Sequence, residues 1–168
     1  MRKTRLLYYR QPLVVNEMVV EALVMRSELN VNEYLEKLSR ASSRDGCGAL
    51  VMFMGFVKGL VDEESVNELV YEAYENYALS KMREIGEEAV KKFGVRDVVV
   101  VHRVGNLRPG DPTIYIFVTA KSRGEAFKAA EYVLERVKHE VPISKLEVRS
   151  DGEFWVLGDG RRIRRPKI

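Results

Sequence analysis

The sequence is poor in the residues that bind zinc or form disulfides. Its 168 residues include one cysteine, Cys47, and two histidines, His102 and His139. A single cysteine excludes an internal disulfide, and these three side chains together argue against a tetrahedral zinc site. The sequence therefore predicts no metal ion and favours a reducing compartment.

Long apolar runs are also absent. No stretch approaches the ~20 apolar residues that a membrane helix needs. Residues 1–5 are basic, but the segment after them is interrupted by Arg10 and Pro12, too early for the core of a signal peptide. We therefore expect a cytoplasmic protein that is not inserted in a membrane.

Charge is unevenly distributed, although the net charge is only +3. Residues 1–16 carry four Lys or Arg and residues 161–168 carry five, and neither segment contains an acid. The remaining 19 Lys and Arg face 25 acids, so the body of the chain is mildly acidic, at −6. Basic ends of this kind bind nucleic acid or an acidic partner in some proteins and are merely solvated in most.

The composition is that of one soluble folded domain. Hydrophobic residues make up 46% of the chain and charged residues 32%, which allows a core to be buried beneath a soluble surface. No repeat, low-complexity block or Pro/Gly/Ser-rich linker divides the sequence. The length also matches a single domain.

Apolar patterns in the first half predict both strands and helices. Residues 6–25 are strand-like, Asn30 or Asn32 caps a short helix, and the run at 48–57 is typical of a strand buried on both faces. Apolar residues at steps of three and four then predict a helix that ends at Gly94. That apolar stripe consists of Ala78, Met82, Ile85, Ala89 and Phe93.

Three further strands are predicted in the middle of the chain. They cover residues 65–74, 98–104 and 113–119, where β-branched and aromatic residues are frequent. The connection between the last two, residues 105–112, consists mainly of turn residues such as Gly, Asn, Pro and Asp.

The last third of the chain predicts a helix and a hairpin. The helix begins at a capping box, Ser122 followed by Glu125, and Pro142 ends it. Residues 145–149 and 153–156 flank an Asp-Gly turn, which is typical of a hairpin. Since the elements do not alternate strictly as βαβ, the expected class is α+β, with helices packed on a largely antiparallel sheet.

Cations around this last helix are the main candidates for chemistry, because the common catalytic motifs (P-loop, GxGxxG, HExxH, GxSxG, DxDxDG) are missing. Lys121 and Arg123 flank the helix start, Lys138 lies in its last turn, and Lys145 follows Pro142. A proline-broken return of this length can bring the two later lysines to one pocket. Two close ammoniums lower each other's pKa, so one lysine can act as a base or nucleophile while the other binds an anion. The alternative is that Lys138 only complements the helix dipole.

Two other residues raise catalytic hypotheses. His102, beside Arg103 at the end of an apolar strand, is either an acid–base group or a hydrogen-bonded core histidine. Cys47, between Gly46 and Gly48, is either a nucleophile or persulfide carrier, or a small hydrophobic residue. The sequence favours the structural interpretation for both.

Six segments occur in an order that resembles the large, catalytic subunit of molybdopterin synthase. They are GALVMFMGFVK (48–58), YEAY (71–74), VHRVG (101–105), RPGD (108–111), SRGEAF (122–127) and VKHEVPISK (137–145). The resemblance covers roughly residues 22–157. It implies an N-terminal extension at 1–21, a single domain at 22–160 and a basic C-terminal tail at 161–168.

The resemblance implies an α/β-hammerhead-like fold with an additional small β-subdomain. It also implies a homodimer of large subunits, each binding one small ubiquitin-like sulfur-carrier subunit, to give a heterotetramer. The implied activity is that of a sulfurtransferase of molybdenum cofactor biosynthesis. Sulfur passes from the C-terminal thiocarboxylate of the carrier to a small pterin substrate, cyclic pyranopterin monophosphate, and forms the dithiolene of molybdopterin. The family's large subunit itself needs no metal or organic cofactor.

The resemblance also implies roles for individual residues. Lys138 matches the principal catalytic lysine, beside the inserted carrier tail, and Lys145 matches the second one, which binds and helps to activate the substrate. An arginine of the tail, Arg161 or Arg162, is expected to reach the pocket of the dimer mate. The residues that match substrate-binding segments are Phe56, Val57, Lys58, Ser122, Arg123, Leu146 and Glu147.

Three departures from the family pattern concern substrate fit more than the type of reaction. Lys58 stands where the family usually has arginine, which keeps the charge but loses bidentate binding. Residues 59–61 stand where the family commonly has an Asn and a His after that arginine. Ser122 stands where the family has a His directly before the arginine that Arg123 matches. Two alternatives stay open: a nucleic-acid-binding α+β module that uses the basic ends, and a non-catalytic scaffold. The retained lysines Lys138 and Lys145 argue against the scaffold.

Overall fold

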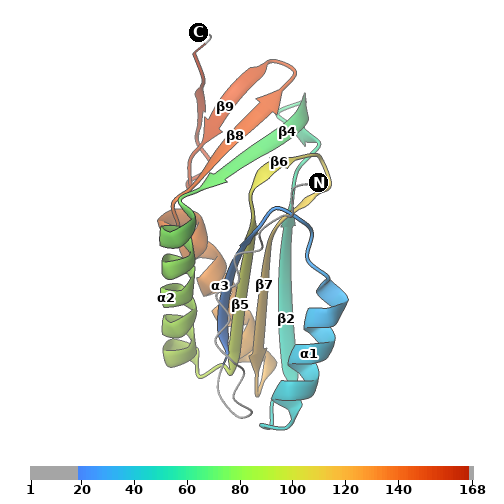
Figure 1. Ribbon diagram of the computed structural model, residues 1–168, viewed down its shortest axis with the longest axis vertical. Helices are drawn as coiled ribbons and strands as arrows, with labels where there is room; N and C mark the ends of the chain where they lie inside the picture. Colours follow the sequence, from blue (N-terminus) through green and yellow to red (C-terminus); the bar gives the residue numbers. More distant parts are fainter. Residues whose placement is uncertain (1–18, 167–168) are drawn as a thin grey trace, which may run out of the picture.

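The computed structural model describes residues 19–166, which contain three helices and ten strands (Figure 1). In chain order these are β1 Val20–Met25, α1 Val31–Ser43, β2 Ala49–Phe56, β3 Leu60–Val61, β4 Glu64–Ala73, α2 Glu75–Phe93, β5 Asp97–Arg103, β6 Gly105–Leu107, β7 Pro112–Ala120, α3 Arg123–Glu140, β8 Ile143–Arg149, β9 Gly152–Val156 and β10 Arg162–Arg164.

The strands form two sheets, with the second above the first in Figure 1. The first sheet has the strand order β1-β5-β7-β2, and the second has the order β10-β9-β8-β4-β3, with β6 also paired to β4. Among the described strands, every pairing is antiparallel except that of β1 with β5. The predicted α+β class, with a largely antiparallel sheet and a second small β-subdomain, is confirmed.

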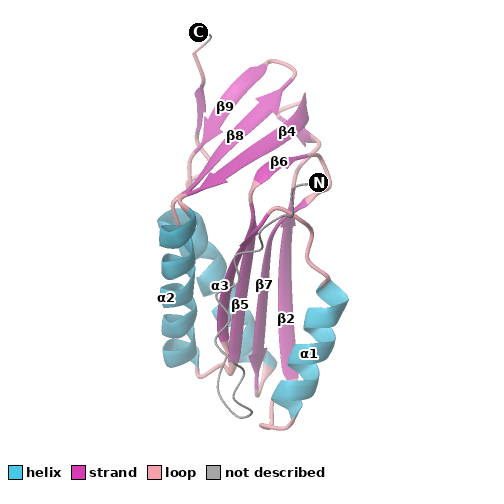
Figure 2. Cartoon of the chain, viewed as in Figure 1, coloured by secondary structure: helices cyan, strands magenta, loops and turns pink. Residues whose placement is uncertain are grey.

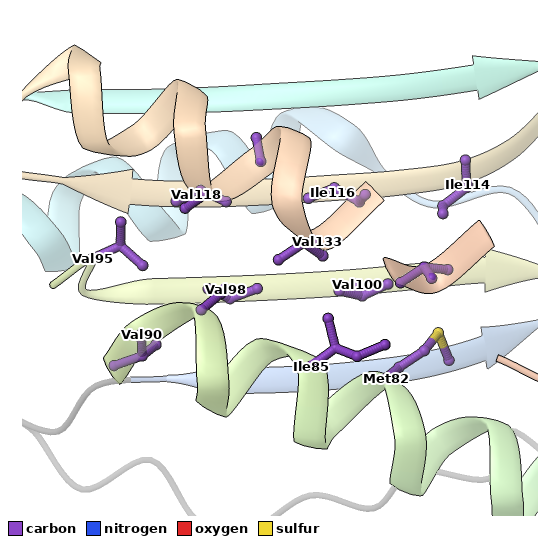
Figure 3. Close-up of a cluster of buried hydrophobic side chains, with 14 of the residues drawn as sticks. Met82, Ile85, Val90, Val95, Val98, Val100, Ile114, Ile116, Val118 and Val133 are labelled. Atoms are coloured by element: carbon purple, nitrogen blue, oxygen red, sulfur yellow. The ribbon is translucent and has the colours of Figure 1, made fainter. Parts of the chain in front are cut away.

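Helices α2 and α3 cover one face of the first sheet and form the main core with it (Figures 2 and 3). Alternate residues of β5 and β7, such as Val98 and Ile116, point toward these helices, as the period of two in a strand requires. Gly86 lets α2 approach closely, since a Cβ there would lie 2.6 Å from Val20 Cγ1. Gly94 ends the helix in the left-handed conformation, as predicted. The fully buried residues of the predicted stripe are Ala78, Met82, Ile85 and Ala89.

Helix α1 covers the opposite face. Asn30 is its N-cap, and the Asn30 side chain accepts a hydrogen bond from the Glu33 amide at 3.3 Å, which confirms the first of the two predicted capping residues. Leu38 is buried against the sheet, and the Tyr34 ring stacks on Phe117 with 5.5 Å between centroids. The first sheet is therefore sandwiched between helices.

The prediction that residues 48–57 form a strand buried on both faces holds only for the first part of the strand. Residues 49–53 are half-buried and pack on both faces, with Ala49, Val51 and Phe53 against one hydrophobic cluster and Leu50 and Met52 against another. The strand exists as β2, but it is the edge strand of the first sheet, beside β7 only. Its last residues extend past the covering helices, so Met54 is 41% exposed and Phe56 is 60% exposed. The apolar end of β2 is thus a surface feature.

The connection at residues 105–112 is not only a turn. Gly105–Leu107 form β6, which pairs with β4 through Leu69, Val70 and Tyr71. This short strand joins the first sheet to the second, because β5 ends at Arg103 and the chain enters the second sheet two residues later.

Described strands reach into both predicted terminal segments. β1 begins at Val20, within the segment assigned to an N-terminal extension, and most of the strand-like stretch at 6–25 lies outside the described residues. At the other end, Arg162–Arg164 form β10 at the edge of the second sheet, next to β9. Part of the basic tail is therefore an ordered strand.

Candidate active site

The connection between α3 and β8 brings the two candidate lysines to one end of the first sheet. Lys138 lies exposed in the last turn of α3. Val141 leaves the helical conformation, and Pro142 has no amide hydrogen to continue the helix. The chain then reverses into β8, where Lys145 pairs across the strands with Tyr71 of β4.

Lys145 is half-buried, and its pKa lies below the ordinary value of a lysine. Burial is the main cause, since it disfavours the charged ammonium. The positive charges of Arg162, Lys58 and Lys138 lower the pKa further, whereas the carboxylate of Glu147 raises it. The predicted effect of neighbouring ammoniums is present, but it is secondary to burial.

Glu147 is the buried acid of this site, with 2% of its surface exposed. Its carboxylate accepts two hydrogen bonds from Arg162, at 2.8 Å from Nε and 3.2 Å from Nη2. Arg149 Nη1 lies 3.8 Å from the same carboxylate. Glu147 is therefore already satisfied by its own chain. The predicted part of Glu147 in substrate binding stays a prediction.

The other residue of the predicted segment, Leu146, is buried. Neighbouring side chains of a strand point to opposite faces, so Leu146 points away from the face that carries Lys145 and Glu147. Leu146 can contribute only its backbone to a site on that face.

The strand end at Phe56, Val57 and Lys58 lies on the lysine side of the molecule. Val57 is buried and is held by two backbone hydrogen bonds, from its amide to Asp111 O at 3.0 Å and from the Gly110 amide to its carbonyl at 2.9 Å. Phe56 and Lys58 on either side are exposed. Since Lys58 contributes to the lowered pKa of Lys145, the structure brings this segment to the site.

Ser122 and Arg123 lie at the other end of α3. The helix rises ~1.5 Å per residue, so Arg123 is about 22 Å along the axis from Lys138. One chain therefore does not bring these residues into the lysine site. Ser122 is the N-cap residue as predicted, but the two amide hydrogen bonds of a capping box do not form, because the Ser122 hydroxyl donates to the Glu125 carboxylate instead.

His102 lies in the core beneath Lys145. Its Nδ1 is 2.8 Å from the Arg103 carbonyl oxygen, which can only accept, so Nδ1 carries the hydrogen. Burial lowers the pKa of His102 to about 4, and the nearby Lys145 charge acts in the same direction. The ring packs edge-on against Tyr71 with 5.2 Å between centroids. A neutral, buried imidazole supports the structural interpretation of His102.

Cys47 is half-buried, and burial, followed by the charge of Asp97, raises the pKa of its thiol. A protonated thiol is a poor nucleophile, which agrees with the small-hydrophobe interpretation. Across residues 19–166, no group of three or more His, Cys, Asp or Glu side chains could hold a metal ion. No helix in that range is long and apolar enough to span a membrane.

Sequence reasoning missed the pairing of Arg162 with Glu147 within one chain. The alternation of Lys145, Glu147 and Arg149 along a strand was visible, and it indicates a charged face on β8. What the sequence does not show is that β10 folds back beside β9 and supplies the partner of the central acid.

Together, the fold and the site define a class of protein. It is an α+β protein in which a half-buried lysine, Lys145, lies within the electrostatic influence of Lys58, Lys138 and the Arg162–Glu147 pair, a site that suits an anionic ligand and offers an amine for proton transfer. Comparison with known proteins then gives the family. Residues 24–140 match the family described as MoaE protein, and the chain belongs to this family.

Curated relatives and solved structures agree with this assignment. The molybdopterin synthase catalytic subunit of Pyrococcus abyssi is 38% identical over 139 residues, which are 82% of this chain and 91% of the relative. That of Bacillus subtilis is 32% identical over 133 residues, covering 79% and 82%. The crystal structure of molybdopterin synthase from Staphylococcus aureus superposes with a TM-score of 0.71 at 33% identity, covering 79% of this chain and 93% of that one.

Proposed function

We propose that this chain is the catalytic subunit of a molybdopterin synthase. It transfers sulfur from the C-terminal thiocarboxylate of a small ubiquitin-like carrier subunit to cyclic pyranopterin monophosphate, and the dithiolene of molybdopterin forms. Family membership and the names of the relatives support this proposal. The observation that carries it within the structure is the half-buried Lys145, whose pKa is lowered by burial and by the positive charges of Arg162, Lys58 and Lys138.

The site suits both reactants because both are anions. The pterin carries a phosphate, and the carrier tail ends in a thiocarboxylate. Lys138 is exposed at the end of α3, where an incoming tail can reach it, and we assign to it the contact with the carrier and the transfer of a proton. Lys145 is recessed and loses its proton more readily than an ordinary lysine, so at the bound pterin it suits activation of the substrate by accepting a proton from it. Lys58 supplies a further charge for the phosphate.

The proposed assembly is a homodimer that binds two carriers, a heterotetramer. The position of Arg123 bears on this assembly. Since Arg123 lies about 22 Å along α3 from Lys138, it can bind the same substrate only from a second copy of the chain. The exposed Phe56 adds apolar surface at the strand end, next to Lys58. An apolar residue beside a charged rim is common at protein interfaces.

The test is a single-turnover assay that contains this protein, a thiocarboxylated carrier and cyclic pyranopterin monophosphate, with detection of the pterin product. Replacing Lys138 by Ala should lower the rate by about 10²–10⁴-fold, the usual contribution of a positioned proton-transfer group. The fold should persist, because an exposed lysine contributes within about 0.5 kcal/mol to the free energy of unfolding.

The matched control is Lys128→Ala, which removes another exposed lysine of α3 and should leave the rate unchanged. Wild-type turnover by the Lys138 variant would contradict the catalytic assignment. If the wild-type protein bound the carrier but formed no product, the proposed activity itself would be wrong.

A further inference from the structure

The face of β8 that carries Lys145 is a row of alternating charges. Lys145, Glu147 and Arg149 follow one another at every second residue, so their side chains share a face of the second sheet. Glu147, in the middle, is nearly inaccessible to solvent. Burying a carboxylate costs free energy unless cations and hydrogen bonds compensate for the lost hydration. The partners of Glu147 therefore decide how strongly its negative charge acts on Lys145 and Arg149.

Arg162 is the closest of these partners. Its guanidinium holds the Glu147 carboxylate with Nε and Nη2, at 2.8 Å and 3.2 Å. Arg149 is farther away, at 3.8 Å, and its Nε and Nη2 are hydrogen-bonded to Asp151 instead. Arg162 therefore provides the main neutralising charge for the acid that lies two residues from Lys145.

Several backbone contacts fix Arg162 in this position. β10 pairs with β9 at the edge of the second sheet, with Arg162 opposite Val156 (in Figure 1 the last coloured segment runs beside β9). The Leu157 amide donates to Arg161 O at 2.9 Å and closes the loop between the two strands. In that loop, Gly158 packs against the last turn of α3, close to the Lys138 carbonyl. The segment from Gly158 to Arg162 thus contacts both the turn of α3 that carries Lys138 and the acid near Lys145, Glu147.

We propose that Arg162 and Glu147 form a positioning pair for Lys145: by occupying the buried carboxylate, Arg162 prevents Lys145 from forming that ion pair and leaves its amine free to accept a proton from the substrate. Without Arg162, the nearest cation to Glu147 is Arg149, whose Nη1 lies 3.8 Å away, beyond hydrogen-bond distance. Lys145, two residues from Glu147 on the same face of β8, is then the next cation that can pair with the acid. Lys145 would then hold its proton and point toward the acid.

The direction of the electrostatic effects agrees with this role. Glu147 raises the pKa of Lys145, and Arg162 lowers it, so the two charges oppose each other at the amine. Burial of Lys145 remains the largest effect. The titratable and charged groups that face Lys145 are Lys58 after β2, Tyr71 of β4, His102 of β5, Lys138 of α3, Glu147 of β8 and Arg162 of β10.

The catalytic consequence of the pair rests on the proposed function, but its effect on Lys145 can be measured without turnover. The full-length protein is treated with trace acetic anhydride over a range of pH, and acetylation of the peptide with Lys145 is followed by mass spectrometry. Acetylation of Lys138 in the same sample is the internal reference. The midpoint of the pH dependence reports how strongly Lys145 holds its proton.

The variants give opposite expected results. Arg162→Gln should move the Lys145 midpoint upward by about one pH unit, because Glu147 loses its partner. Glu147→Gln should move it downward, and the double variant should lie between the two. Arg165→Gln is the control, since Arg165 pairs with Glu153 at 3.1 Å and should leave the midpoint unchanged.

An unchanged or lowered midpoint in Arg162→Gln, or an equal shift in the Arg165 control, would overturn the proposal. If Arg162→Gln does not fold, the conservative Arg162→Lys and the Glu147→Gln variant decide the question. Arg162→Lys should move the Lys145 midpoint upward by less than is expected for Arg162→Gln. Glu147→Gln must still move the Lys145 midpoint downward. If the midpoints move as expected while the wild-type protein forms no pterin product, the pair stands and the proposed reaction fails.

Discussion

Gly158 offers the sharpest test of how the loop after β9 is packed against the end of α3. Replacing it by Ala would place a methyl group 2.7 Å from the Lys138 carbonyl oxygen and 3.4 Å from His139 Nδ1. Ordinary van der Waals contact requires the carbon–oxygen separation to grow by about 0.7 Å. The neighbour is helix backbone, so either the loop or the end of α3 must move.

The expected cost follows from this overlap. Overpacking against a rigid neighbour costs about 1–3 kcal/mol of the free energy of unfolding. For a domain of this size, that corresponds to a decrease in Tm of about 3–9 °C. Since Gly158 has no φ in the left-handed region, backbone strain adds nothing, and the destabilising part of the effect is steric.

The assay compares thermal unfolding of Gly158→Ala with that of Gly48→Ala. At Gly48, the added Cβ would lie 3.6 Å from the Lys121 carbonyl oxygen, an ordinary contact, so this variant should unfold within about 2 °C of the wild type. Equal Tm values for the two variants would refute the packing argument. A decrease confined to Gly158→Ala, together with slower turnover, would confirm that this loop supports the lysine site.

Two further predictions concern buried polar groups. His102 has a pKa of about 4 in the folded chain against 6.5 for an ordinary histidine, so only the unfolded chain takes up the His102 proton as the pH falls from 6.5 to 4. This contribution lowers the free energy of unfolding by about 3 kcal/mol. Carboxylates with a lowered pKa, such as Glu88 and Glu140, titrate in both proteins, so a pH series of urea denaturation should show a decrease that is about 3 kcal/mol larger in the wild type than in His102→Gln. Asp97 is fully buried and accepts hydrogen bonds from Thr119 Oγ1 at 2.5 Å and from Arg96 Nη1 at 2.8 Å. Asp97→Ala should therefore lower the free energy of unfolding by about 3–5 kcal/mol in the same assay. Asp45 is the exposed partner of Arg96, so Asp45→Asn should lower it by less than about 1 kcal/mol.

Local patterns predicted the elements that local interactions determine. The α2 stripe and its end at Gly94 follow from helical spacing and from the left-handed conformation that glycine adopts easily. The β8–β9 hairpin follows from its turn residues, and β8 and β9 pair with Arg149 opposite Gly152. Neither feature needs information from distant parts of the chain.

The errors concern properties that depend on distant neighbours. The end of β2 is exposed because β2 is the last strand of its sheet, and strand order is not contained in an apolar run. β6 becomes a strand because β4 offers it a partner, although its own residues favour a turn. The separation of Arg123 from Lys138, about 22 Å along the axis of α3, likewise depends on the direction of the helix, and the predicted part of Arg123 in substrate binding stays a prediction.

The pairing of β4 with β8 has a consequence for the order of folding. Tyr71 lies opposite Lys145, and the segment between them contains α2, β5, β6, β7 and α3. A chain emerging from the ribosome has every strand of the first sheet available before β8, β9 and β10 have been synthesised. Contacts across so long a loop form slowly, because the entropy of closing the loop is lost before the contacts compensate for it. The hydrophobic core can therefore form ahead of the lysine site, and a chain cut short before β8 would keep its core sheet and lack the strand that carries Lys145.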